Sequence, residues 1–174
     1  MKTVEESGVI FGEFEEEQLF VIEYSDVHKK AGEGIKTVEF VYLTKNDNLL
    51  FVEAKKSCPN AANRYEDANK EIKYEEYYSE ITDKFIDSIN MYAATALGRY
   101  NDCTSVGKKL RNKDSYEKTK LRFILVITNA EDDWLMGPKA ELEERLLRYR
   151  KIWKADILVL NRQTAKDFGL VKED

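Results

Sequence analysis

The sequence contains one histidine, two cysteines and two prolines among 174 residues. A single imidazole, on His28, excludes sites that need a histidine pair or a histidine-rich metal cage. Cys58 and Cys103 are too few for a disulfide framework and neither belongs to a CxxC pair, so we expect reduced thiols in a cytoplasmic protein.

Long apolar runs and nucleotide-binding glycine motifs are also missing. No 18 consecutive residues are apolar and the first residues carry no apolar segment, so we expect neither a membrane span nor a secretory signal. The absence of Walker-type and Rossmann glycine patterns, and of a GxSxG motif, disfavours nucleotide-dependent phosphoryl transfer, hydride transfer and serine hydrolysis.

The composition that is present suits a folded protein. Hydrophobic residues make up 43 % and charged residues 35 % of the chain, enough apolar side chain for a core. The length and the lack of repeats or linkers predict a single domain over residues 1–174. The net charge of −5 disfavours a globally basic nucleic-acid coat, although residues 1–33 are acid-rich and residues 108–122 are base-rich.

Strand-like runs dominate the first half of the chain. Short apolar, β-branched and aromatic segments predict strands at 9–11 and 19–22. Longer runs at 35–43 and 49–55 flank five residues rich in Asn and Asp, and this arrangement predicts a β-hairpin. We therefore expect an N-terminal antiparallel meander.

Helical and strand patterns alternate in the second half. The spacing of Ile81, Phe85, Ile89 and Tyr92 predicts an amphipathic helix within the region that opens after Pro59. Residues 98–115 are expected to form a loop.

A β-α-β unit is expected to follow this loop. Continuous apolar runs at 121–128 and 156–160 predict buried parallel strands on either side of a helix over 139–153, with Pro138 at a first helical position. Thr164 is expected to cap a short final helix. The predicted fold is α/β (mixed α+β), a central mixed sheet flanked by helices.

Charged residues stand at one end of the predicted hairpin. Side chains alternate across a strand, so Glu53 and Lys55 share a face with Phe51, and closing the hairpin brings Glu39 toward Glu53. Buried carboxylates need compensation, and carboxylate oxygens with a backbone carbonyl, here that of Ala54, suit Mg²⁺ or Mn²⁺. A lysine beside such a metal can contact an attacking water or balance the charge of a phosphate.

These residues resemble a known motif. Glu39, followed fourteen positions later by Glu53-Ala54-Lys55 on the second strand of a hairpin, resembles the motif of the PD-(D/E)XK nuclease superfamily. The order of elements over roughly residues 8–161 is similar to the restriction-endonuclease-like core. The resemblance implies a metal-dependent nuclease that hydrolyses phosphodiester bonds of nucleic acid, DNA in the first instance, as an endo- or exodeoxyribonuclease.

The resemblance also implies roles for individual residues. Glu39 and Glu53 would bind Mg²⁺ or Mn²⁺ together with the Ala54 carbonyl, and Lys55 would assist the water. The family often has a further acid on an N-terminal helix, for which four residues remain candidates: Glu13, Glu16, Glu17 and Glu23.

Two other interpretations remain open. A catalytically inactive member of the same fold would act by binding nucleic acid or protein, and the acid-rich first 33 residues favour this more than a free-standing DNA enzyme. A small protein-interaction domain with an accidental ExK triplet is the third. The sequence also leaves open a homodimer or a partner protein.

Other clusters are weaker candidates. The basic residues between Lys108 and Arg122 could form a phosphate-binding surface or a solvated loop, and we favour the solvated loop. A second ExK triplet, Glu71-Ile72-Lys73, lies in a polar segment, whereas Glu53-Ala54-Lys55 follows an apolar run and has a second acid beside it. The tyrosines at 65, 74, 77 and 78 are expected to pack a helix against the sheet and not to stack on bases.

Overall fold

The computed structural model describes residues 1–172, and residues 173–174 of the predicted domain lie outside this range. The first half of the chain forms, in order, β1 (Lys2–Glu6), β2 (Val9–Phe14), η1 (Glu16–Gln18), β3 (Leu19–Phe20), α1 (Asp26–Ala31), β4 (Phe40–Leu43), β5 (Asn48–Lys55) and η2 (Ala61–Asn63). The second half forms α2 (Ala68–Ala96), α3 (Lys108–Arg111), β6 (Lys120–Ile127), η3 (Asp132–Trp134), α4 (Met136–Arg145), α5 (Leu147–Trp153), β7 (Asp156–Leu160) and α6 (Arg162–Asp167).

The central sheet has five strands in the order β3-β4-β5-β6-β7. Strands β3, β4 and β5 pair antiparallel, and β5, β6 and β7 pair parallel, so the mixed sheet predicted from the sequence is confirmed. Strand β5 lies in the middle and belongs to both the hairpin and the parallel half. The first two strands form a separate two-stranded sheet.

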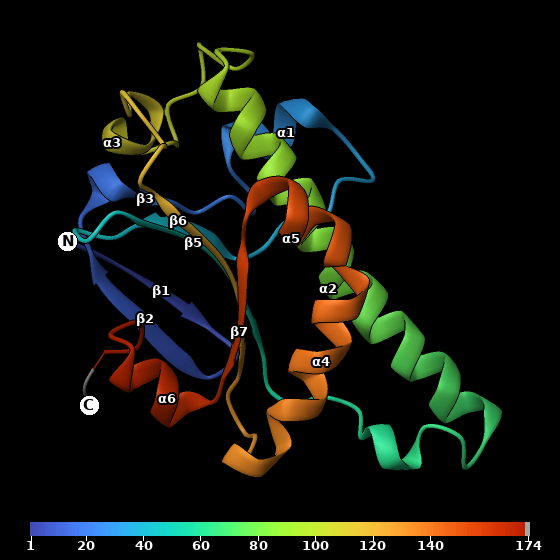
Figure 1. Ribbon diagram of the computed structural model, residues 1–174. Coiled ribbons are helices and arrows are strands. Elements are labelled where there is room, and N and C mark those ends of the chain that lie inside the picture. Colours follow the sequence, from blue (N-terminus) through green and yellow to red (C-terminus); the bar gives the residue numbers. More distant parts are fainter. Residues whose placement is uncertain (173–174) are drawn as a thin grey trace.

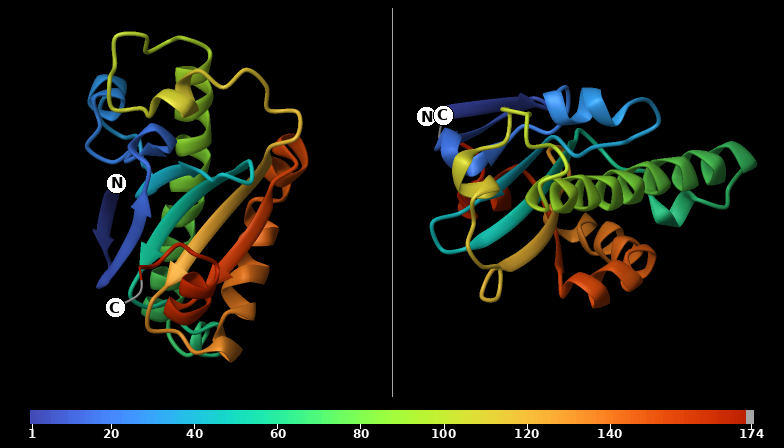
Figure 2. Two further views of the ribbon diagram at one scale, coloured as in Figure 1. Left: turned by 90° about the vertical axis from the view of Figure 1, so that its left-hand side faces the viewer. Right: turned by 90° about the horizontal axis from the view of Figure 1, so that it is seen from above.

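Each face of the sheet is covered by a different layer (Figure 1). The long helix α2, with α4 and α5, lies on one face, and the β1–β2 hairpin with α6 lies on the other, as the turned views also show (Figure 2). Alternation along β5 serves both layers: Leu49 and Phe51 join the core beneath α2, whereas Leu50 and Val52 join the core beneath the hairpin.

The long helix α2 is the element that faces the predicted site. Its first turn is capped by Asp67, whose side chain accepts a hydrogen bond from the Lys70 N–H. The predicted apolar stripe from Ile81 to Tyr92 is buried against the sheet. Of the four tyrosines, Tyr74 and Tyr78 are buried, Tyr77 is half-buried, and Tyr65 is exposed.

Several predicted boundaries are wrong for physical reasons. Strand β4 begins only at Phe40 because α2 takes the preceding backbone donors: Lys36 N–H donates to Asp87 and Val38 N–H donates to Ser88. The helix expected over 139–153 begins at Met136 and is divided into α4 and α5 at Leu146, where ψ is 8°.

The cap predicted for the last helix is also wrong. Asn161 is the cap of α6, and Thr164 is the partner at the third helical position of a capping box. Strand β1, helix α1 and the short α3 in the loop after α2 are not predicted from the sequence.

Two predictions about residue chemistry can be compared directly with the structure. Both Cys58 and Cys103 are free thiols, as expected. Of the helices within residues 1–172, none is long and apolar enough to cross a membrane.

Candidate active site

The β4–β5 hairpin brings Glu39 and Glu53 together. The register pairs Phe40 with Val52, and the Glu39 N–H donates to the Val52 carbonyl at 3.1 Å, so Glu39 and Glu53 lie opposite each other just beyond the last pair of β4. Both carboxyl groups continue the face of Phe51 toward α2, and both are buried. The predicted juxtaposition of the two acids is therefore present.

Helix α2 supplies two charged residues to this cluster. Glu80, Lys84 and Ser88 are spaced four residues apart, so they form one stripe along the helix. The Lys84 Nζ lies 2.8 Å from Glu53 Oε1 and 3.8 Å from Glu39 Oε1, and the side chain is only 14 % exposed. The ammonium group thus faces both acids from the helix side and lies closer to Glu53.

Lys55 points into the same cluster from the end of β5. Its Nζ lies 2.8 Å from Glu80 Oε1 and 3.3 Å from Glu53 Oε1, and its side chain is 27 % exposed. Glu53 Oε1 therefore has two ammonium neighbours. Glu53 Oε2 is buried and, among the described residues, has no hydrogen-bond partner.

The backbone carbonyl of Ala54 lies in the plane of the sheet, between the side chains of its two faces. It accepts a 3.1 Å hydrogen bond from the Ser7 hydroxyl in the β1–β2 turn. The turn is held in place by a second bond, from the Thr128 hydroxyl to the Ser7 carbonyl. Ser7 and Gly8 both have positive φ, as a two-residue hairpin of type I′ requires.

Of the four candidates for a further acid, Glu23 is the one beside the site. Its carboxyl group contributes to the raised pKa of Glu39, and it lines the same cavity as Lys84. The other three are elsewhere: Glu13 pairs with Lys172, Glu17 lies near Lys109, and Glu16 lines a cavity near α3.

The electrostatic environment favours the protonated form of Glu39. Burial and the charge of Glu53 raise the pKa of Glu39 to about 8, against the opposing effect of Lys84. Burial also raises the pKa of Glu53, although Lys84 and Lys55 oppose it. Burial lowers the pKa of Lys55, but the hydrogen bond to Glu80 and the charge of Glu53 outweigh it and raise that pKa overall.

The donor set fits a hard divalent cation only in part. Glu39, Glu53 and the Ala54 carbonyl offer oxygen ligands, and Glu53 Oε2 is an unused buried acceptor. Within residues 1–172, no group of three or more His, Cys, Asp or Glu side chains is arranged to hold a metal ion. A metal at this place would therefore rely on water for its remaining ligands, as Mg²⁺ commonly does.

A cavity of about 630 Å³ opens beside the cluster. Glu23, Glu80 and Lys84 line it, together with Lys36 and Thr37 from the segment before β4. The cavity gives the cluster access to solvent from the side of α2 and α1.

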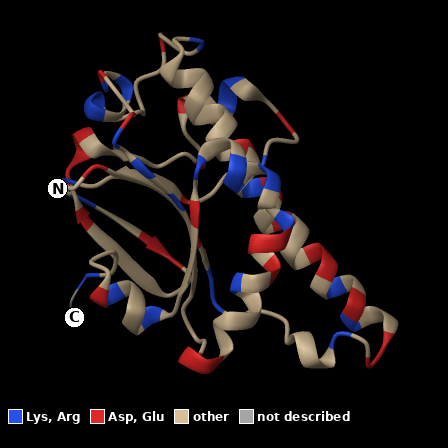
Figure 3. Ribbon diagram, in the orientation of Figure 1, with Lys and Arg blue, Asp and Glu red and all other residues tan. Residues whose placement is uncertain are grey.

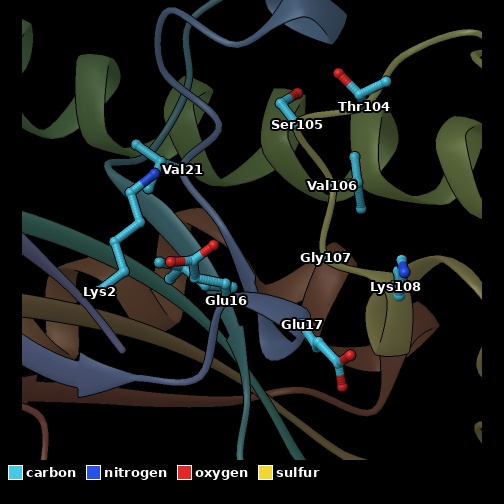
Figure 4. A pocket seen from close by; sticks show the side chains of 10 residues that line it. Lys2, Glu16, Glu17, Val21, Thr104, Ser105, Val106, Gly107 and Lys108 are labelled. Carbon is cyan, nitrogen blue, oxygen red and sulfur yellow. The ribbon is translucent and has the colours of Figure 1, made fainter.

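A second cavity, of about 430 Å³, is lined by Glu16 and Glu17 but by none of Glu39, Glu53, Ala54 and Lys55 (Figure 4). It lies between η1 and the loop before α3, where the backbones approach so closely that a Cβ on Gly107 would lie 2.5 Å from the Glu17 carbonyl oxygen. Glu16 and Lys108 both line it. The mixed charge gives it no clear chemistry.

The two competing sequence signals are located away from this cluster. The basic residues of α3 lie at the other end of the molecule from the start of α2 (Figure 3), and Lys109 and Lys113 are paired with Glu15 and Asp47. The second ExK triplet lies in the first turns of α2 with all three side chains exposed. The second ExK triplet has the solvated character that the sequence predicts, whereas the basic segment is only partly solvated, since Arg111, Lys113 and Arg122 are half-buried.

Sequence reasoning missed Lys84 and Glu80. The available signal was a polar stripe, Glu80-Lys84-Ser88, which repeats every four residues beside the apolar stripe of the same helix. The face of α2 that meets the end of β5 depends on the tertiary fold, so the stripe alone does not identify its partners.

Comparison of the chain with protein-family models, with curated proteins and with solved structures finds no significant match.

Proposed function

We propose that this protein is a metal-dependent nuclease with a restriction-endonuclease-like core that hydrolyses phosphodiester bonds, DNA being the first substrate class to test. The observation that carries the proposal is the pairing of two buried acids, Glu39 and Glu53, with the partly exposed amine of Lys55 at one strand end. The order of hairpin, long helix and parallel strands supports the same assignment.

Each residue has a defined task in this proposal. Glu39 and Glu53 would hold Mg²⁺ or Mn²⁺ with the Ala54 carbonyl, and the bound ion would supply Lewis-acid stabilisation of phosphate charge. Lys55, whose amine is the more accessible of the two lysines, would orient the attacking water or balance charge on the phosphate. Burial of the two acids keeps bulk water from competing for their oxygens.

The test is cleavage of supercoiled plasmid and of single-stranded DNA with Mg²⁺ or Mn²⁺. We expect cleavage that EDTA abolishes and that Lys55→Ala reduces by about 100-fold or more, the usual scale of a lost proton-transfer group. Lys73→Ala, in the exposed second ExK triplet, is the matched control and should cleave like the wild type. A folded wild-type protein that cleaves neither substrate with either metal would overturn the assignment.

One observation favours the alternative of a catalytically inactive binding module. Lys84 already faces both acids without a metal, and the cavity beside the cluster is lined by further carboxylates, Glu23, Glu76 and Glu80. The same plasmid assay, combined with a direct measurement of Mn²⁺ binding, separates the two functions. A binding module would neither bind Mn²⁺ at the acid cluster nor cleave the plasmid.

A further inference from the structure

The position of Lys84 has a consequence for metal binding. Its ammonium group donates to Glu53 Oε1 at 2.8 Å and lies 3.8 Å from Glu39 Oε1, so it faces both carboxylates that would hold a cation. Two positive charges cannot share this space, since the low-polarity surroundings strengthen their repulsion.

We propose that Lys84 is a built-in counter-cation, which holds the two acids in the metal-free protein and must leave them when a divalent metal binds. The proposal rests on the metal site of the proposed function. Glu53 Oε2, buried and without a hydrogen-bond partner among the described residues, is the acceptor with which a metal would first engage the pair.

The structure provides a place for the displaced ammonium. The cavity of about 630 Å³ is lined by Lys84 itself and by Glu80, which precedes Lys84 by one helical turn and is 45 % exposed. Rotation of the lysine side chain into this cavity brings it toward Glu80 and solvent. Metal binding would thereby move positive charge from the acids into the cavity through which an anionic substrate would approach.

Lys55 does not have the same role. It also lies near Glu53 Oε1, at 3.3 Å, but its shorter contact is with Glu80 at 2.8 Å, and no ion pair links it to Glu39. Removal of Lys55 therefore deletes one positive charge, as removal of Lys84 does, but leaves the ammonium group of Lys84 in place beside Glu39 and Glu53. This makes Lys55→Met the matched control for Lys84→Met.

The first experiment measures Mn²⁺ binding by titration calorimetry for the wild type, Lys84→Met, Lys55→Met and Glu53→Gln. Only molecules in which Lys84 has left the two acids can bind the metal, so the apparent Mn²⁺ affinity of the wild type is reduced to the fraction of such molecules. Lys84→Met should therefore bind Mn²⁺ about tenfold tighter than the wild type. Lys55→Met should show a clearly smaller gain. Equal gains in the two variants, or none in Lys84→Met, would overturn the role of Lys84.

The Glu53→Gln variant separates this result from a failure of the metal site. Loss of Mn²⁺ binding in Glu53→Gln shows that the acids are the ligands. If the wild type and Lys84→Met both bind no Mn²⁺, or if Glu53→Gln binds as well as the wild type, the metal site of the proposed function is absent and the counter-cation role falls with it.

A second measurement uses only the wild-type protein, so that its result does not depend on the folding of Lys84→Met, in which two buried acids lack their counter-charge. Amine acetylation is followed by mass spectrometry with and without Mn²⁺. Displacement from the acids should raise the labelling of Lys84 several-fold, whereas Lys36, which pairs with Asp83 at the edge of the same cavity, should not change. Unchanged labelling of Lys84 under conditions where Mn²⁺ binds contradicts the displacement.

Discussion

The Ser7 hydroxyl donates a 3.1 Å hydrogen bond to the carbonyl of Ala54, 47 residues further along the chain. This bond ties the tight turn between β1 and β2 to the strand that carries Glu53 and Lys55. It also occupies the carbonyl that the sequence motif assigns to a metal. The N-terminal hairpin is therefore part of the structure of the site and not only a cover for the sheet.

Replacement of Ser7 tests this connection. We expect Ser7→Ala to lower the free energy of unfolding by about 0.5–1.5 kcal/mol, the usual net value of one hydrogen bond. If the Ala54 carbonyl is a metal ligand, the variant should also bind Mn²⁺ more tightly, because the carbonyl no longer has a competing donor. Urea unfolding and calorimetry measure the two effects. The exposed Ser57→Ala should change neither, and an unaltered stability of Ser7→Ala would show that the bond contributes nothing in solution.

A second contact positions Glu39 from the helix side. The Ser88 hydroxyl on α2 is fully buried and accepts the N–H of Val38, the residue before Glu39, at 2.9 Å. Ser88→Ala leaves a buried N–H without a partner, so we expect a loss of about 1–3 kcal/mol in unfolding free energy. We also expect weaker Mn²⁺ binding, since Glu39 is no longer held in place.

The matched control lies on the same helix. Thr95 is also buried, but its hydroxyl donates to the Met91 carbonyl within α2. Thr95→Ala should cost less stability and leave Mn²⁺ binding unchanged. Similar losses of Mn²⁺ affinity in both variants would mean that the effect reflects general loosening of α2 and not the position of Glu39.

Local patterns were sufficient for much of the fold. The apolar runs of β6 and β7, the turn between β4 and β5 and the stripe of α2 are properties of short windows, and each of these elements is present. The opposition of Glu39 and Glu53 follows from the hairpin register alone. These features depend on neighbours within about fifteen residues.

The features that the sequence did not reveal depend on distant contacts. Lys84 and Glu80 reach the acid cluster only because α2 packs across the end of β5. Glu23 can be chosen among the four candidate acids only when the path of the chain before β4 is known. Strand β1 is polar along most of its length and is stabilised as a strand by pairing with β2. Such tertiary effects override local propensity.

The raised pKa of Glu39 gives stability a pH dependence. Its ordinary pKa is 4.5 and its pKa in the folded protein is about 8, so between these values the folded chain keeps a proton that the unfolded chain releases. The free energy of unfolding should therefore fall as the pH rises through this window and level off above it. Glu39→Gln cannot titrate and should flatten the curve.

Urea unfolding in EDTA at about pH 5.5, 7 and 8.5 measures this slope. Glu33→Gln, an exposed carboxyl in the loop after α1, should retain the wild-type slope. A stability that does not fall from pH 5.5 to 8.5 in the wild type would show that Glu39 is already ionised in the folded state, with Lys84 as its effective counter-charge.

Glu80 helps to raise the pKa of Lys55. Burial lowers the pKa of the amine, and the hydrogen bond to Glu80 is the largest of the effects that raise it, followed by the charge of Glu53 and then that of Glu80. We therefore expect Glu80→Gln to lower the pKa of Lys55, since the burial remains and the compensating charge is lost. Competitive acetylation as a function of pH, with mass spectrometry of the peptide that contains Lys55, measures this pKa without reference to any activity.

The matched control is Glu76→Gln, which removes an equal charge from the same helix and the same cavity lining without touching Lys55. Its Lys55 titration should follow that of the wild type. If the two variants shift the titration equally, the effect is a general field of the acidic helix. A shift confined to Glu80→Gln identifies the direct ion pair as the cause. Lys55 is then more readily deprotonated in that variant. If the nuclease uses Lys55 as a proton acceptor, cleavage by Glu80→Gln should therefore extend to lower pH.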